Sequence, residues 1–229
     1  MMKIFLSLVA ILTGVALLTA PLVHAESKRE LHQPTVIYKS KIAQEIASYT
    51  AHIKQHPNDY QAYFNLSKTL ERIRRYDLAI KYFTRTIEIN PSFAEAYSAR
   101  GGIYCQIGKY DHALRDAEKA VELNPNFAQP YNVLGEIYLN LQQYDSAIKN
   151  FDRAIKLHPQ FAEAYLNRSL VRANLGEYDR AISDVTKAIE LNPNFAEAYR
   201  LRAMFYEECG EFSKAQSDFA KAKSLGYYG

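Results

Sequence analysis

Few residues in this chain could do chemistry, and they are scattered. His52 and His56 are four positions apart, which places both rings on one helix face, but two ligands without a third are weak grounds for a metal site. Glu207 and Glu208 are adjacent carboxylates of a kind common on helix surfaces. No His-Glu-x-x-His, glycine-rich phosphate loop, Gly-x-Ser-x-Gly or Cys-x-x-Cys is present. The sequence predicts a protein that is not an enzyme and has no metal and no cofactor.

The elements that carry these residues follow a strict period. Prolines recur every thirty-four residues, at Pro57, Pro91, Pro125, Pro159 and Pro193. A fixed period of this length is typical of arrays of helical repeats. The repeats are expected at residues 60–93, 94–127, 128–161, 162–195 and 196–229.

Each repeat is expected to contain two antiparallel helices. In the third repeat, Tyr131, Leu134 and Tyr138 recur at helical spacing, and Ala147 and Phe151 do so again after a polar turn. Large side chains that face columns of alanine suit two closely packed helices. The tyrosine columns are therefore interpreted as core, which disfavours an aromatic platform for nucleic acid.

The second helix of each repeat should end just before the proline, because the residue before a proline avoids the helical region. That residue is Asn at positions 90, 124 and 192. Asparagine tolerates the left-handed conformation on which many helices end, so such an ending is expected here.

Tyr131-x-x-Leu134-Gly135-x-x-Tyr138, Ala147-x-x-x-Phe151 and Pro159 resemble the pattern of the tetratricopeptide repeat family, with Tyr where the family often has Trp. The resemblance covers residues 60–229. It implies an all-α fold, a right-handed α-solenoid of helix-turn-helix repeats, whose first helices line a concave groove. It also implies that the protein holds a peptide or another protein.

The amino-terminal segment has the features of a secretory signal peptide at residues 1–25. Lys3 precedes an apolar run from Ile4 to Leu18, and Val23-His24-Ala25 puts small side chains at the cleavage positions. The alternative is an uncleaved membrane anchor at residues 4–23. A disordered linker is expected at residues 26–35 and a capping helix at 36–58, the degenerate half of a repeat.

The formal net charge of the chain is +3, and removal of Lys3 with the signal peptide leaves 3 − 1 = +2. A balance this close to neutral gives no electrostatic reason to bind nucleic acid or an anionic membrane.

An arginine column and an aspartate column vary together from repeat to repeat. Arg100, Arg168 and Arg202 of the first helices are matched by Asp116, Asp184 and Asp218 of the second helices. The pattern predicts an Arg–Asp bridge within repeats two, four and five; recent duplication of these repeats is the alternative. Cys105 and Cys209 lie in repeats two and five, too far apart for the Cα separation that a disulfide allows, so no bridge between them is expected.

The ligand surface is expected on first-helix residues that point away from the core of their own repeat. Leu166, Leu170 and Met204 are apolar there, and methionine suits an adaptable binding surface; burial by neighbouring helices is the alternative. The columns reproduce neither the carboxylate clamp nor the asparagine ladder known in the family. The candidate ligand residues are Phe64, Asn65, Lys68, Asn132, Leu166, Asn167, Leu170, Arg200 and Met204.

These observations together favour an exported, bacterial periplasmic, monomeric scaffold that binds a protein or peptide and does not insert in the membrane after signal cleavage. Two alternatives stay open: an assembly factor tethered by residues 4–23, and an accessory subunit that regulates an enzyme.

Overall fold

The structure, a computed structural model, describes residues 33–227. The expected signal peptide, the alternative anchor at 4–23 and most of the expected linker lie outside the described residues. From Ile42 onward the described residues form one compact unit, which contains the helical array from residue 60.

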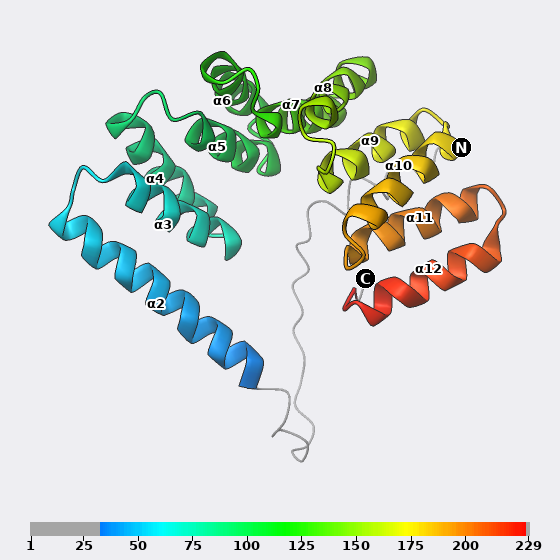
Figure 1. Cartoon of the computed structure of the whole chain (residues 1–229), viewed down its shortest axis with the longest axis horizontal. Coiled ribbons are helices and arrows are strands. Elements are labelled where there is room, and N and C mark those ends of the chain that lie inside the picture. Colours follow the sequence, from blue (N-terminus) through cyan, green and yellow to red (C-terminus); the bar gives the residue numbers. More distant parts are fainter. Residues whose placement is uncertain (1–32, 228–229) are drawn as a thin grey trace. The chain divides into compact units, whose positions relative to one another are not determined.

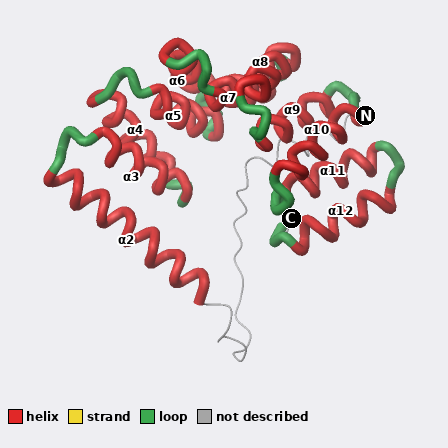
Figure 2. Tube along the Cα trace, viewed as in Figure 1, coloured by secondary structure: helices red, strands yellow, loops and turns green. Residues whose placement is uncertain are grey.

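The described residues form eleven α-helices joined by short loops, without a strand (Figures 1 and 2). The helices are α2 (Gln33–Gln55), α3 (Tyr60–Arg72), α4 (Tyr76–Ile89), α5 (Ala94–Gln106), α6 (Tyr110–Leu123), α7 (Ala128–Asn140), α8 (Tyr144–Leu157), α9 (Ala162–Asn174), α10 (Tyr178–Leu191), α11 (Ala196–Glu208) and α12 (Phe212–Ser224).

From α3 onward the helices pack in consecutive pairs, and each pair packs on the next. We call α3, α5, α7, α9 and α11 the first helices, and α4, α6, α8, α10 and α12 the second helices. First helices of neighbouring pairs touch, α5 with α7 and α7 with α9, whereas successive second helices make no comparable contact. The first helices therefore lie on the inner side of a curved stack, and the expected all-α solenoid of helix-turn-helix repeats is confirmed.

Alanines allow the two helices of each pair to approach closely. The first turn of four second helices contains a completely buried alanine: Ala79, Ala113, Ala147 and Ala181. In the pair α7/α8 the approach is closer still, because a Cβ built on Gly135 would lie 2.5 Å from Cε1 of the buried Phe151 ring. The volume that Gly135 leaves free is filled by that ring.

The turn inside each pair requires a left-handed residue. Gly108, Gly176 and Gly210 have φ of 74° to 76°, and Arg74 and Gln142 take the same conformation at 58° and 59°. Glycine has no steric cost there, whereas a side chain does.

The expected left-handed ending at the asparagines before the prolines is wrong. Asn90, Asn124 and Asn192 have φ of −129°, −143° and −137°. Each side-chain oxygen instead accepts a hydrogen bond from the backbone N–H two residues later, at 3.2 Å. The asparagines therefore stabilise the loop between repeats through an Asx turn.

Helix α2 begins at Gln33, so residues 33–35 are helical rather than part of a linker. Pro34 is compatible with a first helical turn, where a backbone N–H has no helical partner. Ile46, Tyr49 and Ile53 pack against the buried cluster that contains Leu66 of α3. None of the helices in the described part is long and apolar enough to cross a membrane.

Candidate peptide-binding surface on the first helices

The nine expected ligand residues all lie on first helices, and their exposure differs widely. Lys68 is exposed, and Phe64, Asn65, Asn167, Leu170, Arg200 and Met204 are partly buried. Leu166 is only 4% exposed and belongs to a core cluster that includes Val185 of α10 and Leu201 of α11. The expectation that Leu166 meets solvent is therefore wrong, and the apolar surface of this region consists of Leu170 and Met204.

The three expected ligand residues on α3 contact neighbouring residues of the first repeat, up to Phe93 immediately before α5. The Phe64 ring packs edge-on against Phe83 and Phe93, with centroids 5.6 and 5.0 Å away. Asn65 Oδ1 accepts a hydrogen bond from Gln61 Nε2 at 3.3 Å, and Lys68 Nζ donates to Glu71 Oε2 at 2.5 Å. Phe64 therefore contributes mainly to packing between the first two repeats.

A polar cluster joins α7 to α9. Asn132 Nδ2 donates to Glu136 Oε1 at 2.6 Å, and Asn167 Nδ2 lies 2.8 Å from the same oxygen and 3.2 Å from Asn132 Oδ1. Asn132 is only 2% exposed, so its amide serves the cluster rather than a ligand directly. Two of the expected ligand residues, Asn132 and Asn167, are thus brought together by a third residue, Glu136, which was not among them.

Burial raises the pKa of the half-buried Glu136 carboxyl to about 7, although the two amide donors lower it and the nearby Glu163 charge adds to the increase. On the neighbouring helix α5, burial and then the Glu136 charge raise the pKa of the Cys105 thiol to about 12. Glu136 is therefore harder to ionise than an ordinary glutamate, and Cys105 stays a neutral thiol.

Arg200 lies at the carboxyl-terminal part of the surface. Its Nη1 lies 2.9 Å from Met204 Sδ, and its guanidinium carbon is 5.2 Å from the centroid of the Tyr227 ring. Arg200 Nε is buried without a hydrogen-bond partner among the described residues. Leu170 and Met204 pack at the edge of the core cluster that contains Leu166.

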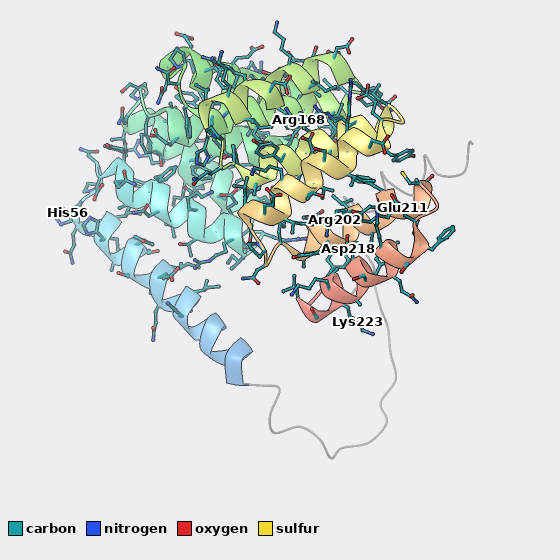
Figure 3. All side chains as sticks on the ribbon, turned by 45° about the vertical axis from the view of Figure 1, so that its right-hand side comes forward. His56, Arg168, Arg202, Glu211, Asp218 and Lys223 are labelled. Atoms are coloured by element: carbon teal, nitrogen blue, oxygen red, sulfur yellow. The ribbon has the colours of Figure 1, made fainter. Side chains whose placement is uncertain are left out.

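The predicted Arg–Asp bridges are confirmed and lie inside the helix pairs. Arg100, Arg168 and Arg202 each donate two hydrogen bonds to the carboxylate of Asp116, Asp184 and Asp218, at 2.6 to 2.9 Å. In Figure 3, Arg202 of α11 and Asp218 of α12 lie close together.

The same arginines also contact the second helix of the preceding pair. Their Nη1 atoms contact Thr84 of α4, Asp152 of α8 and Thr186 of α10, respectively. Each arginine therefore connects three helices, which is a structural role.

The remaining candidates for chemistry do not form a site. His52 Nε2 lies 2.8 Å from Asp59 Oδ2, and its ring centroid is 4.6 Å from that of His56, the labelled residue at the end of α2 in Figure 3. Within residues 33–227, no group of three side chains is placed to hold a metal ion. Both cysteines are free, with Cys105 buried and Cys209 exposed.

Two open surface hollows occur elsewhere. One lies beside Arg168 and Lys187 on α9 and α10, and the other lies beside Phe127 and Phe161 at the starts of α7 and α9. None of the nine expected ligand residues lines either hollow.

This stack of helix pairs, with a polar cluster on its inner helices, defines a helical-repeat solenoid. Tetratricopeptide repeat profiles match residues 60–93, 94–127, 117–149 and 134–206. The chain therefore carries tetratricopeptide repeats.

Several solved structures are similar to this chain. The crystal structure of MamA is 29% identical, covers 70% of this chain and 94% of its own, and has a TM-score of 0.56. TTC0263, a thermophilic TPR protein of Thermus thermophilus, is 27% identical, covers 73% of this chain and 91% of its own, and has a TM-score of 0.68. YrrB, described as a TPR protein with an unusual peptide-binding site, is 25% identical, covers 78% of this chain and 92% of its own, and has a TM-score of 0.52. A comparison with curated proteins finds no match.

Glu136 shows what sequence reasoning missed. Its helical position already placed it on the inner side of α7, but its contact with Asn167, thirty-one residues later, depends on how two repeats stack. The only signal in the sequence was a carboxylate in a column otherwise occupied by Lys68, Gly102, Leu170 and Met204.

Proposed function

We propose that this protein is a non-enzymatic scaffold that holds an extended segment of a partner protein along its first helices. The observation that carries the proposal is the polar cluster of Asn132, Glu136 and Asn167, with the partly buried Leu170 and Met204 on the following first helices. The Asn167 amide and the Glu136 carboxylate can bond a peptide backbone or polar side chain, and the apolar pair can bury an aliphatic or aromatic one.

The similarity to YrrB supports this proposal, since that protein is described as having a peptide-binding site. The proposed groove comprises the exposed or partly exposed members of the expected set: Phe64, Asn65, Lys68, Asn167, Leu170, Arg200 and Met204. Burial of each apolar contact by a ligand would contribute roughly 1.5–3 kcal/mol.

The proposal includes export through a cleaved signal peptide at residues 1–25 and action as a monomer in a bacterial periplasm. Tethering by an uncleaved segment at 4–23 is the competing proposal. Mass spectrometry of the protein from its native envelope decides between them: a mature chain beginning at Glu26 supports export, and an intact amino terminus supports tethering.

Peptide binding is tested by selecting ligands for the purified protein from a random-peptide display library. The selected peptides are then measured against the double variant Leu170→Glu with Met204→Glu. We expect affinity to fall at least tenfold, because two carboxylates replace the apolar contacts. The matched control is Leu141→Glu with Leu175→Glu, two apolar residues exposed at the turns between helices, which should leave affinity unchanged.

Circular dichroism must show the same helical content for both double variants. Selected peptides that bind the groove variant as well as the wild type would refute the proposal. An enzyme-regulating role would appear instead as co-purification with a catalytic partner whose activity changes on addition of this protein.

A further inference from the structure

The Glu136 carboxyl group lacks the partner that a half-buried carboxylate normally has. No ion pair among residues 33–227 includes Glu136. The buried aspartates of this protein, by contrast, each bind an arginine. The charged residue that acts most on Glu136 is another carboxylate, Glu163. The charge of Glu136 is therefore uncompensated in this part of the structure.

The two oxygens of this carboxyl group differ. Oε1 accepts both amide hydrogen bonds, from Asn132 and Asn167, which fills the lone pairs of that atom. Oε2 accepts no hydrogen bond from the described residues. Among the described residues, the buried side-chain atoms without a hydrogen-bond partner are Ser98 Oγ and Arg200 Nε. Oε2 has no partner and is not one of these atoms, so it is not fully buried and solvent reaches it. One oxygen is held in place, and the other is open.

The neighbouring first helix α5 has free space at the register position that corresponds to Glu136. Gly102 occupies on α5 the register position that Glu136 occupies on α7, and these two helices are in contact. A Cβ at Gly102 would meet only Val133 Cγ2 within 4 Å, at 3.8 Å. Gly102 thus leaves this position on α5 open, whereas the half-buried Leu170 takes the equivalent position on α9.

We propose that Glu136 binds a primary ammonium group of the peptide held on the first helices, through Oε2. This inference rests on the proposed function. An ammonium is a point charge that can bond a single oxygen, whereas a guanidinium achieves its full bonding only with both oxygens of a carboxylate. Because Oε1 is already occupied, the geometry favours lysine or an amino-terminal amine over arginine.

The proposal carries a pH dependence with a defined sign. Only the ionised carboxylate attracts an ammonium, and the Glu136 pKa of about 7 means that the carboxyl is largely protonated in weak acid. The Cys105 thiol on α5, with a pKa of about 12, stays neutral, and Glu163 on α9 is the other carboxylate acting here. Affinity for ammonium-bearing peptides should therefore fall as the pH decreases below about 7.

The test uses peptides selected for the wild-type protein from a random-peptide library, each also synthesised with norleucine in place of lysine, with arginine in place of lysine, and with an acetylated amino terminus. Affinities are measured for the wild type, Glu136→Gln and the control Glu118→Gln, which changes an exposed carboxylate on α6. Norleucine keeps the aliphatic stem and removes only the charge. A charge-assisted hydrogen bond of this kind corresponds to a loss of roughly tenfold to a hundredfold.

We expect removal of one ammonium to reduce affinity by this factor for the wild type and Glu118→Gln, and to have no effect for Glu136→Gln. Loss on norleucine substitution assigns the ammonium to lysine, and loss on acetylation assigns it to the amino terminus. Equal losses in Glu136→Gln and wild type would overturn the inference, as would selected peptides without an ammonium requirement or with arginine preferred.

Two variants separate the groove from the ammonium site. If the Leu170→Glu, Met204→Glu variant loses the peptides but Glu136→Gln binds them like the wild type, the groove stands and the ammonium site does not. If neither variant affects binding, the proposed function itself is refuted.

Discussion

At the scale of single residues, Glu136 has unusual surroundings. Its carboxyl group receives two amide donors from α7 and α9, yet its pKa is still raised to about 7, because loss of solvation outweighs the hydrogen bonds. A protein that keeps a partly desolvated carboxyl without a cation loses stability whenever that group is ionised. This cost should be measurable.

The stability of the wild type relative to Glu136→Gln should depend on pH. Because the folded pKa is above the ordinary value of 4.5, the folded state holds more protons than the unfolded state between about 4.5 and 7. The wild type should lose roughly 1–3 kcal/mol relative to the variant as the pH rises through this window, and no more above it. Glutamine can still accept both amides. Denaturant unfolding at several pH values measures the difference, and a pH-independent difference would contradict the assignment.

Replacement of a glycine by alanine should have opposite effects on stability at two positions of the first helices. Gly135→Ala should destabilise the protein by about 1–3 kcal/mol, because the new methyl group would overlap the buried Phe151 ring. Gly102→Ala should stabilise it by roughly 0.5–1 kcal/mol, because alanine favours a helix and this Cβ meets only Val133 at an ordinary contact distance. Thermal unfolding of both variants is the measurement, and equal shifts would mean that α7 and α8 are not packed as described.

At the scale of elements, the arginine bridges couple helices within and between repeats. Asp184 is 4% exposed and binds both Arg168 and Arg172, and Arg168 also contacts Asp152 of the preceding pair. Loss of the Asp184 charge leaves Arg172 without its carboxylate and Arg168 with Asp152 alone, which costs far more than loss of an exposed pair.

Asp184→Asn should therefore destabilise the protein by about 3–5 kcal/mol. The exposed pair Lys119–Glu122 is the control, and Glu122→Gln should cost no more than about 1 kcal/mol. A double-mutant cycle with Arg168→Leu should show strong coupling. Additive effects would mean that the bridge adds nothing beyond the separate side chains.

The elements also show which features the sequence could predict. The proline period and the alternation of large residues with alanine predict the helix pairs, because both follow from local packing. The Arg–Asp bridges could be predicted because the two columns vary together. The burial of Leu166 could not, since it depends on α11 from the next repeat, and neither could the contact of Glu136 with Asn167. Local patterns specify a repeat, whereas the surface is determined by how repeats stack.

At the scale of the whole helical array, contacts are arranged to leave one side available. The first helices α5, α7 and α9 contact one another in turn, and the second helices lie on the other side of the stack. A repeat array is stabilised mainly by contacts between neighbours, so it can present one side over several repeats without a single large core. The central claim is that the first helices hold the partner, with the main contacts on α7, α9 and α11.

Hydrogen–deuterium exchange with and without a selected peptide tests this claim most directly. Bound peptide should slow exchange in α7, α9 and α11, around Asn167, Leu170 and Met204, and leave α8, α10 and α12 nearly unchanged. Protection confined to the second helices, or to the turns near Leu141 and Leu175, would contradict the claim.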